Sequence, residues 1–203
     1  PCLQTGKNRS HCWVDRSKMK LFEAIYTIYY LLKFKIFKKG VTIGNGLRIH
    51  GRLDIRGNGK VIIGNNCRFG IMPGSSKHVT LYTHDKNATI KIGDRVELYG
   101  SMISSRFEII VHDDVVIEET SISDTDFHAI GKDRHVTIEE SINRNRIIIE
   151  DNVSIGARSI ITKGVTVGKG TIVGPGSVVI HSLPANNLAM GNPARIVKKS
   201  QES

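Results

Sequence analysis

The stretch IEDNVSIGARSIITKGVTVGKGTIVGPGSVV, residues 149–179, decides the fold of this 203-residue chain. An aliphatic residue recurs at every sixth position, in the series Ile149, Ile155, Ile161, Val167, Val173 and Val179. A small or β-branched residue stands four positions after each of the first five of these. Self-similarity at a fixed period predicts a repeat architecture, in which each unit buries its apolar side chains only against its neighbours. We interpret each hexad as a short strand plus a turn, and three hexads as one triangular coil of a parallel β-helix.

The same coil can be followed through most of the chain. Corners of the form Ile-Gly, or close to it, mark six equivalent anchors, which are Ile43, Ile63, Ile92, Val111, Ile149 and Val167. Successive anchors are 20, 29, 19, 38 and 18 residues apart. Because one coil takes about 18 residues, the spacing predicts about six coils with two insertions. One insertion lies near 72–86, and the other is a protruding loop, 129–146.

The net charge of +10 is concentrated at the N-terminus. Residues 1–40 contain nine Lys or Arg and two acidic residues, a net charge of +7. No basic-aromatic nucleic-acid motif accompanies them, so we expect no nucleic-acid partner. The three cysteines, Cys2, Cys12 and Cys67, have no paired or metal-like spacing. An odd count without pairing favours a reducing compartment, and together with the absence of a visible signal peptide it predicts a cytoplasmic protein.

The chain divides into four segments. Residues 1–18 are expected to be a disordered or non-native extension, because ordered-looking sequence begins at Met19. Residues 19–39 form an amphipathic helix that is too short and too charged to span a bilayer. It either caps the open end of the β-helix, packs in an oligomer, or makes a peripheral contact with the inner membrane surface. Residues 40–185 are the all-β domain, and 186–203 are a C-terminal cap and tail.

The rhythm of the chain breaks at SDTDFHAI, residues 123–130, where His128 closes the third hexad of a coil. A long loop in a compact fold is usually functional or disordered. Alternation along a strand places Asp124 and Asp126 on the same side as His128. Asp126 or Asp124 is therefore placed to orient the imidazole of His128 or to bind an acceptor.

Residues 149–197, which end in GNPARIV, resemble the left-handed β-helix acyltransferases of the hexapeptide-repeat superfamily. The ending is similar to that of galactoside, maltose and polysaccharide-biosynthesis sugar O-acetyltransferases. The resemblance implies a left-handed helix, acetyl-CoA as acyl donor and a homotrimer. It also implies a saccharide, or a nucleotide- or lipid-linked sugar, as acceptor in surface polysaccharide synthesis. Those enzymes carry their catalytic histidine near the end of the third hexad of a coil, which is the place of His128, so the resemblance implies that His128 is the general base. A neutral imidazole suits such a reaction, because it can take the proton of a sugar hydroxyl and return it to the departing thiolate.

In these relatives the cofactor lies in a groove between two subunits, along the last coils. The matching positions are Ala157, Pro175, Ile180, His181, Arg195 and Lys198. Ala157 must be small for the pantetheine arm, while Arg195 and Lys198 would meet the phosphates. Relatives often have Thr-Lys where this chain has Ile180 and His181, so Lys163 or Lys169 is the expected substitute for a missing phosphate contact.

Three alternatives remain open at this stage. The enzyme acetylates the nitrogen of an amino sugar or the hydroxyl of serine, or the chain is a non-catalytic β-helix scaffold. Zinc is the rival explanation of the histidines. Hexapeptide-repeat carbonic anhydrases use an H-x4-H pair, whereas His78 and His84, like His128 and His135, have other spacings. We therefore expect no metal, and we interpret His112 as an outward corner residue. His78 and His84 contact the acceptor if the first insertion reaches the cleft.

Overall fold

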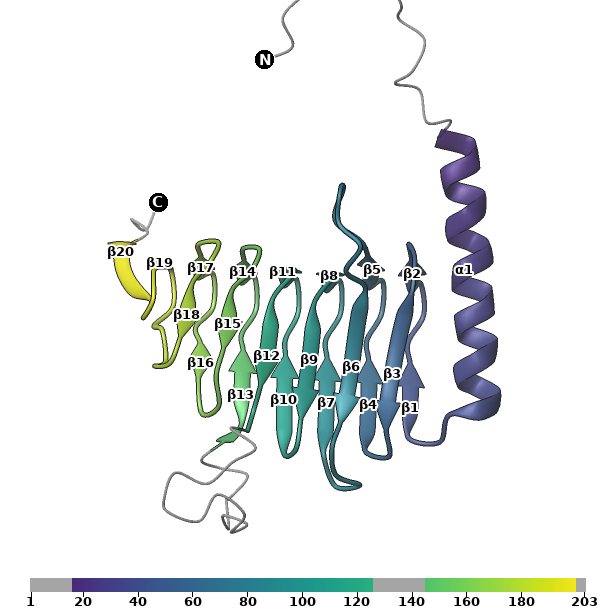
Figure 1. Cartoon of the computed structure of the whole chain (residues 1–203), viewed down its shortest axis with the longest axis horizontal. Coiled ribbons are helices and arrows are strands. Elements are labelled where there is room, and N and C mark those ends of the chain that lie inside the picture. The colour runs from purple at the N-terminus through teal and green to yellow at the C-terminus, as the bar shows by residue number, and fades with distance from the viewer. Residues whose placement is uncertain (1–15, 126–144, 200–203) are drawn as a thin grey trace, which may run out of the picture.

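The computed structural model describes residues 16–125 and 145–199, and Figure 1 shows them as a stack of coils with one helix across its end. Sheet A, along one side of the stack, contains β1 (Val41–Ile43), β4 (Lys60–Ile63), β7 (Thr89–Ile92), β10 (Glu108–Val111), β13 (Ile147–Ile149) and β16 (Thr166–Val167). Sheet B contains β2 (Arg48–Ile49), β5 (Arg68–Gly70), β8 (Glu97–Tyr99), β11 (Val116–Glu118), β14 (Ser154–Ile155), β17 (Ile172–Val173), β19 (Asn187–Met190) and β20 (Arg195–Lys199). Sheet C contains β3 (Leu53–Gly57), β6 (Val79–Thr83), β9 (Met102–Ser105), β12 (Ser121–Ser123), β15 (Ile160–Ile161) and β18 (Val178–Val179).

The six predicted anchors stack directly on one another in sheet A. Ile43 lies opposite Ile63, and Ile63 lies opposite Ile92, with parallel pairing throughout. The column continues through the remaining anchors to Val167. The prediction of an all-β parallel helix of about six coils is therefore confirmed.

Small polar residues also point into the core, and each has a partner there. Ser159, Thr171 and Ser177 are buried to 1% exposure or less. The Ser159 hydroxyl donates to the carbonyl of Gly156 at 2.8 Å, and the Ser177 hydroxyl donates to that of Gly174 at 2.6 Å. Because a buried hydroxyl without a partner costs about 1–3 kcal/mol, these bonds are what make serine acceptable inside the coil.

The glycines after the anchors are needed for the close approach of the next coil. The amide of Gly156 donates to the carbonyl of Val173 in the following coil at 2.8 Å. A Cβ atom at Gly156 would lie 2.8 Å from the backbone nitrogen of Pro175. Crowding by the next coil, rather than a turn that only glycine can adopt, therefore explains the residue at this corner.

The prediction of one insertion across 72–86 is wrong in its shape. Residues 79–83 form β6, which pairs in parallel with β3 and β9. The extra residues are divided between 71–78, ahead of β6, and 84–88, after it. Val79, Leu81 and Thr83 are buried and alternate with more exposed neighbours, the period-two pattern of a strand.

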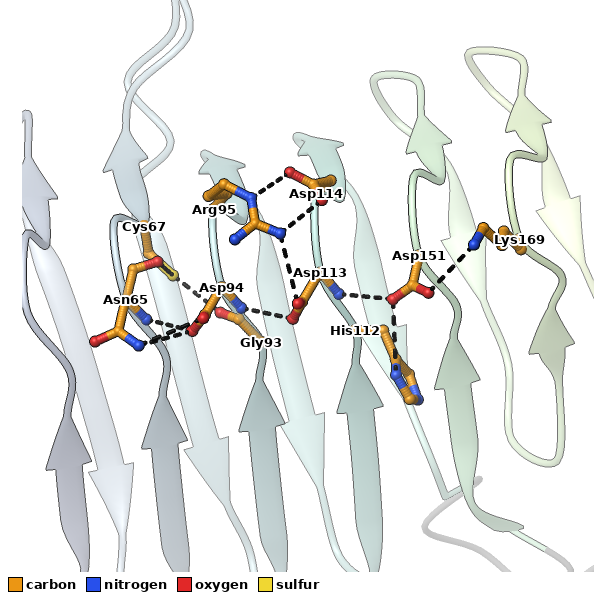
Figure 2. A network of polar contacts seen from close by, with 10 residues as sticks. All are labelled: Asn65, Cys67, Gly93, Asp94, Arg95, His112, Asp113, Asp114, Asp151 and Lys169. Atoms are coloured by element: carbon orange, nitrogen blue, oxygen red, sulfur yellow. Dashed lines mark hydrogen bonds and ion pairs between the residues drawn. The ribbon is translucent and has the colours of Figure 1, made fainter.

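A ladder of polar side chains closes the corner between sheets A and B (Figure 2). The amide oxygen of Asn65 accepts the backbone N–H of Asn45 at 2.9 Å. One coil further, Asp94 accepts the N–H of Asn65 at 2.6 Å, and Asp113 accepts the N–H of Asp94 at 2.8 Å. Asp151 repeats the contact with the N–H of Asp113 at 3.2 Å. Each side chain therefore satisfies a corner amide of the coil before it.

Asp124 closes the corner between sheets C and A one coil before its own. Its side chain is fully buried. One carboxylate oxygen accepts the hydroxyl of Ser105 at 2.7 Å and the N–H of Phe107 at 2.9 Å. The other accepts the N–H of Arg106 at 2.7 Å. Three donors of one turn therefore depend on this carboxylate.

Helix α1 (Arg16–Phe37) lies across the N-terminal end of the stack (Figure 1). Tyr30 and Phe34 are buried in the same apolar cluster as the first coils. The hydroxyl oxygen of Thr27 accepts the N–H of Ile49 at 3.0 Å, which satisfies an amide at the open edge of sheet B. The helix thus covers an end at which backbone groups would otherwise lack partners.

Asp94→Asn should weaken the dependence of the free energy of unfolding on pH in the acid range. The pKa of Asp94 is lowered from 3.8, chiefly because the backbone N–H of Asn65 donates to its carboxylate. A carboxyl with a depressed folded pKa stabilises the protein above its unfolded pKa, and this stability is lost as the pH falls through the folded pKa. Asparagine keeps an oxygen for the amide but does not titrate. Urea midpoints followed from about pH 6 to about pH 2 should therefore fall less steeply in the variant, and equal slopes would contradict the role of Asp94.

Asp124→Ala should lower the free energy of unfolding by about 3 kcal/mol or more, because two backbone amides and a hydroxyl lose their acceptor. Asp124→Asn should also destabilise, since an NH₂ group would then face these donors. Ser105→Ala is the matched control, because it removes one hydroxyl donor and should cost about 1 kcal/mol in urea unfolding. Wild-type stability in Asp124→Asn would contradict the structural role.

Candidate functional site

The stack has three corners, which we name A–B, B–C and C–A after the sheets they join. Ala157 lies between β14 and β15, and Pro175 lies between β17 and β18, so both belong to the B–C corner in consecutive coils. They line one open hollow of about 490 Å³ together with Met72, Pro73, Glu119, Arg158 and Gly176. A volume in this range suits a small ligand or part of a larger one.

The floor of this B–C hollow is backbone. The N–H of Gly176 donates to the carbonyl of Ala157 at 2.9 Å, and Gly156 has no room for a side chain under Pro175. Ala157 adds a single methyl group to this surface. A flexible chain can therefore lie close to the backbone at this corner, and a role of Ala157 in binding the cofactor stays a prediction.

Glu119 and Arg158 line the B–C hollow, and Lys77 lies close to Glu119. The side chain of Glu119 is 10% exposed, and its Oε2 lies 3.7 Å from Lys77 Nζ and 3.9 Å from Arg158 Nε. The side chains of Lys77 and Arg158 are 57% and 80% exposed. Exposed ion pairs at such distances contribute about 0–1 kcal/mol, so either cation can turn to an anionic ligand at little cost. Sequence reasoning missed Arg158 and Lys77, because only the coil brings residues 77, 119 and 158 together.

Three of the expected cofactor residues lie at a different corner. Lys163 follows β15, and Ile180 and His181 follow β18, which places them at the C–A corner. Ile180 and His181 are exposed, while Lys163 is half-buried. Within one chain the structure therefore does not join these residues to Ala157 and Pro175.

Arg195 and Lys198 lie on β20, at the end of sheet B. Strand β20 pairs antiparallel with β19, with Arg195 opposite Met190 and Lys198 opposite Leu188. Both basic residues are exposed. The last strand thus presents positive charge at the C-terminal end of the stack.

The predicted catalytic residues are only partly within the described chain. His128 and Asp126 lie outside the described residues, as do residues 129–144 of the predicted loop. The described chain stops at Thr125 and resumes at Asn145, between β12 of sheet C and β13 of sheet A. Asp124 is within the structure, and its carboxylate is occupied by the corner it closes. A direct catalytic role for Asp124 stays a prediction, and its contacts favour positioning.

His84 lies at the C–A corner after β6, two coils before β12. Its Nε2 is 2.6 Å from the hydroxyl oxygen of Ser104, and its ring centroid is 4.1 Å from that of Tyr82. Partial burial lowers the pKa of His84, the charge of Asp124 opposes this, and Arg106 adds to the lowering. The imidazole is therefore neutral near pH 7. Sequence reasoning placed His84 in an insertion and missed Ser104 as its partner.

His112 is exposed at the A–B corner, where its Nδ1 lies 3.9 Å from Oδ1 of Asp151. Across residues 16–125 and 145–199, no three His, Cys, Asp or Glu side chains are grouped closely enough to hold a metal ion. In the same part of the chain, no helix has the length and apolarity needed to cross a membrane.

Comparison with known proteins identifies the repeat. Residues 146–181 match the family described as bacterial transferase hexapeptide (six repeats). A 2,3,4,5-tetrahydropyridine-2,6-dicarboxylate N-acetyltransferase of Staphylococcus aureus (strain bovine RF122 / ET3-1) is 39% identical over 79 residues, which are 36% of this chain and 33% of that protein. A Clostridium perfringens (strain SM101 / Type A) protein of the same name is 44% identical over 63 residues, 31% of this chain and 27% of the other. The chain thus matches about a third of the length of these relatives.

Solved structures share the whole fold. A structure of AntD, an N-acyltransferase from Bacillus cereus, in complex with dTDP-4-amino-4,6-dideoxyglucose and coenzyme A, has a TM-score of 0.64 at 23% identity. The similarity covers 86% of this chain and 90% of AntD. A hexapeptide-repeat acetyltransferase from Vibrio cholerae has a TM-score of 0.51 at 20% identity, over 92% and 91% of the two chains. Residues 146–181 thus carry the hexapeptide repeat of bacterial transferases, and the chain has the left-handed parallel β-helix fold that the resemblance implied.

Proposed function

We propose that this protein is an acetyltransferase that moves the acetyl group of acetyl-CoA to a sugar. The observation that carries the proposal is the B–C hollow, which lies partly in the matched transferase repeat and combines a backbone floor with the exposed cations Arg158, in its lining, and Lys77, beside Glu119. The pantetheine arm would lie along Ala157 and Pro175. The phosphates would be bound by Arg158 and Lys77, with Arg195 and Lys198 available at the end of the stack. The coenzyme A bound to AntD supports this choice of donor.

The division of the site residues between two corners favours a homotrimer. Ala157 and Pro175 lie at the B–C corner, whereas the segment that contains His128 connects β12 of sheet C with β13 of sheet A. When two chains pack side by side, the B–C corner of one can lie against the C–A corner of the other. A closed ring of three identical chains would repeat this contact three times, with each site made by two chains.

The chemistry assigned to His128 is general base catalysis. Its neutral imidazole takes the proton of the acceptor as the acceptor attacks the thioester carbonyl. The new bond joins the acceptor to the acetyl carbon, and the carbon–sulfur bond breaks. The imidazolium then gives its proton to the departing thiolate of coenzyme A. Protons and charges balance, and the products are an acetylated acceptor and free coenzyme A.

A sugar hydroxyl is our first candidate for the acceptor atom, since a hydroxyl at neutral pH needs a base such as His128 to attack. The nitrogen of an amino sugar is the second candidate. It is favoured by the two N-acetyltransferases matched in sequence and by the amino sugar nucleotide bound to AntD. In both cases the acceptor is a sugar, free or linked to a nucleotide or lipid.

His128→Ala should lower kcat by about 10² to 10⁴ fold with the fold intact. Purified protein, acetyl-CoA and a panel of nucleotide sugars and oligosaccharides should yield free thiol and a product heavier by one acetyl group. His112→Ala is the control, because this exposed histidine lies at the A–B corner, and it should retain nearly the full rate. More than about half of the wild-type rate in His128→Ala would exclude it as the base.

The same assay decides the acceptor atom. Mild alkali hydrolyses an acetyl ester and leaves an acetyl amide intact. Loss of the acetyl group in alkali therefore supports the hydroxyl, and its retention supports the amino sugar. A full panel without thiol release would contradict the proposed function and favour a scaffold.

Ala157→Trp should weaken the binding of coenzyme A by about tenfold or more, measured by calorimetry, because an indole would fill the B–C hollow. Ala185→Trp is the matched control, since Ala185 is an exposed alanine that does not line this hollow. Equal affinity in Ala157→Trp and wild type would refute this placement of the donor.

Mixed oligomers test the shared site. A mixture of His128→Ala and Ala157→Trp chains should recover activity after subunit exchange, because one contact in the mixed ring has both residues intact. Light scattering should give the mass of a trimer. A monomeric mass would exclude the shared site even if the acetyltransferase activity is present.

A further inference from the structure

Helix α1 has a second apolar face that points away from the stack. Ile25, Ile28, Tyr29 and Leu32 follow the i, i+3, i+4, i+7 spacing of one helix face, and each is 54–58% exposed. We call these four residues the outer face of α1. The side of the helix that carries Tyr30 and Phe34 is buried on the first coils. Solvated helix faces are normally polar, so four large apolar side chains in this register indicate a partner.

The segment that carries the outer face is strongly basic. Residues 16–39 contain seven Lys or Arg and a single acid, Glu23. The ammonium of Lys38 donates to the carbonyl of Gly57 at 2.9 Å and so faces the stack. Glu23 faces the stack, where its Oε2 lies 3.3 Å from Nε2 of His50 and its side chain is 17% exposed. Lys33 is exposed with its ammonium 5.9 Å from the centre of the Tyr29 ring, and Lys39 is exposed beyond the helix end. The apolar outer face, together with the exposed Lys33 and Lys39, complements a surface that is anionic and partly apolar.

The orientation of α1 leaves this face accessible. The helix covers the end of the stack, so its outer face looks along the stack axis, while the three sheets form the sides (Figure 1). Side-by-side packing of stacks uses the sides and leaves the ends free. In a ring of three parallel stacks, three outer faces would point in the same direction and could meet one flat surface together.

We propose that the outer face of α1 docks this protein on an anionic membrane surface. The four apolar side chains enter the boundary between headgroups and acyl chains, and the exposed Lys33 and Lys39 meet lipid phosphates. The charge selects lipid over a second copy of the chain, because end-to-end pairing would bring two basic helices together. The docking is independent of the proposed acetyltransferase activity.

Co-sedimentation of the full chain with vesicles tests the proposal. The protein should sediment with vesicles of phosphatidylcholine containing about 30% phosphatidylserine at low salt, and much less with pure phosphatidylcholine. The combined variant Ile25→Gln, Ile28→Gln and Leu32→Gln should lower the partition coefficient by on the order of 100-fold. Lys33→Gln with Lys39→Gln should lower it about tenfold or more at low salt, and the difference should shrink as salt is added.

Two controls separate docking from a general loss of apolar surface or of fold. Ile25→Leu, Ile28→Leu and Leu32→Ile keep the outer face apolar and should sediment like the wild type. Ile62→Gln removes an exposed isoleucine from β4 on the side of the stack and should also sediment normally. Circular dichroism and thermal unfolding of the glutamine variant should match those of the wild type, because the changed side chains are more than half exposed. If the glutamine variant does not fold, the proposal is tested by the loss of sedimentation in the lysine variant and by the dependence of that loss on salt.

Three outcomes would overturn the proposal. In the first, the wild type stays in solution with anionic vesicles at low salt. In the second, it binds neutral and anionic vesicles equally, which removes the charge argument. In the third, sedimentation velocity without lipid shows an end-to-end assembly that the glutamine variant dissociates, and the face is then an interface between copies.

Discussion

Every part of this structure depends on the closeness of successive coils. Each coil donates and accepts backbone hydrogen bonds with the coils above and below, so the chain at a corner must fit directly beneath the next corner. Gly156 has no side chain because the backbone of Pro175 lies over it. Asp94, Asp113 and Asp151 use the same closeness differently, since each reaches back to an amide of the preceding coil. Positions that face neither the core nor the next coil are the ones left for function.

The inward residues could be predicted from the sequence because they recur with the six-residue period of the coil. An aliphatic residue at each sixth position fixes which strands pair, and the register of Ile149 with Val167 followed from counting alone. The insertion at 72–86 was misjudged for the same reason. Counting anchors gives only the net excess between Ile63 and Ile92 and does not show that β6 lies in the middle of it.

The candidate site was less predictable, because it is made of residues that only the coil brings together. Glu119 and Arg158 are 39 positions apart, and their contact depends on the length of the segment between β12 and β13. The alternation rule put Asp124 beside His128, but Asp124 lies at a corner, where its carboxylate turns inward to the amides of Arg106 and Phe107. Strand alternation does not hold where the chain turns.

The two ends of the stack differ from its middle, and they make its length finite. A parallel β-helix has an inherent tendency to grow, since its last coil presents the same hydrogen-bonding edge as every coil before it. In this chain α1 covers the first coil, and β20 runs antiparallel to β19 after the last. A strand of reversed direction gives a following parallel coil the wrong pattern of donors and acceptors. In sheet B both ends of the repeat are therefore covered or reversed, which disfavours the joining of copies end to end into fibres through this sheet.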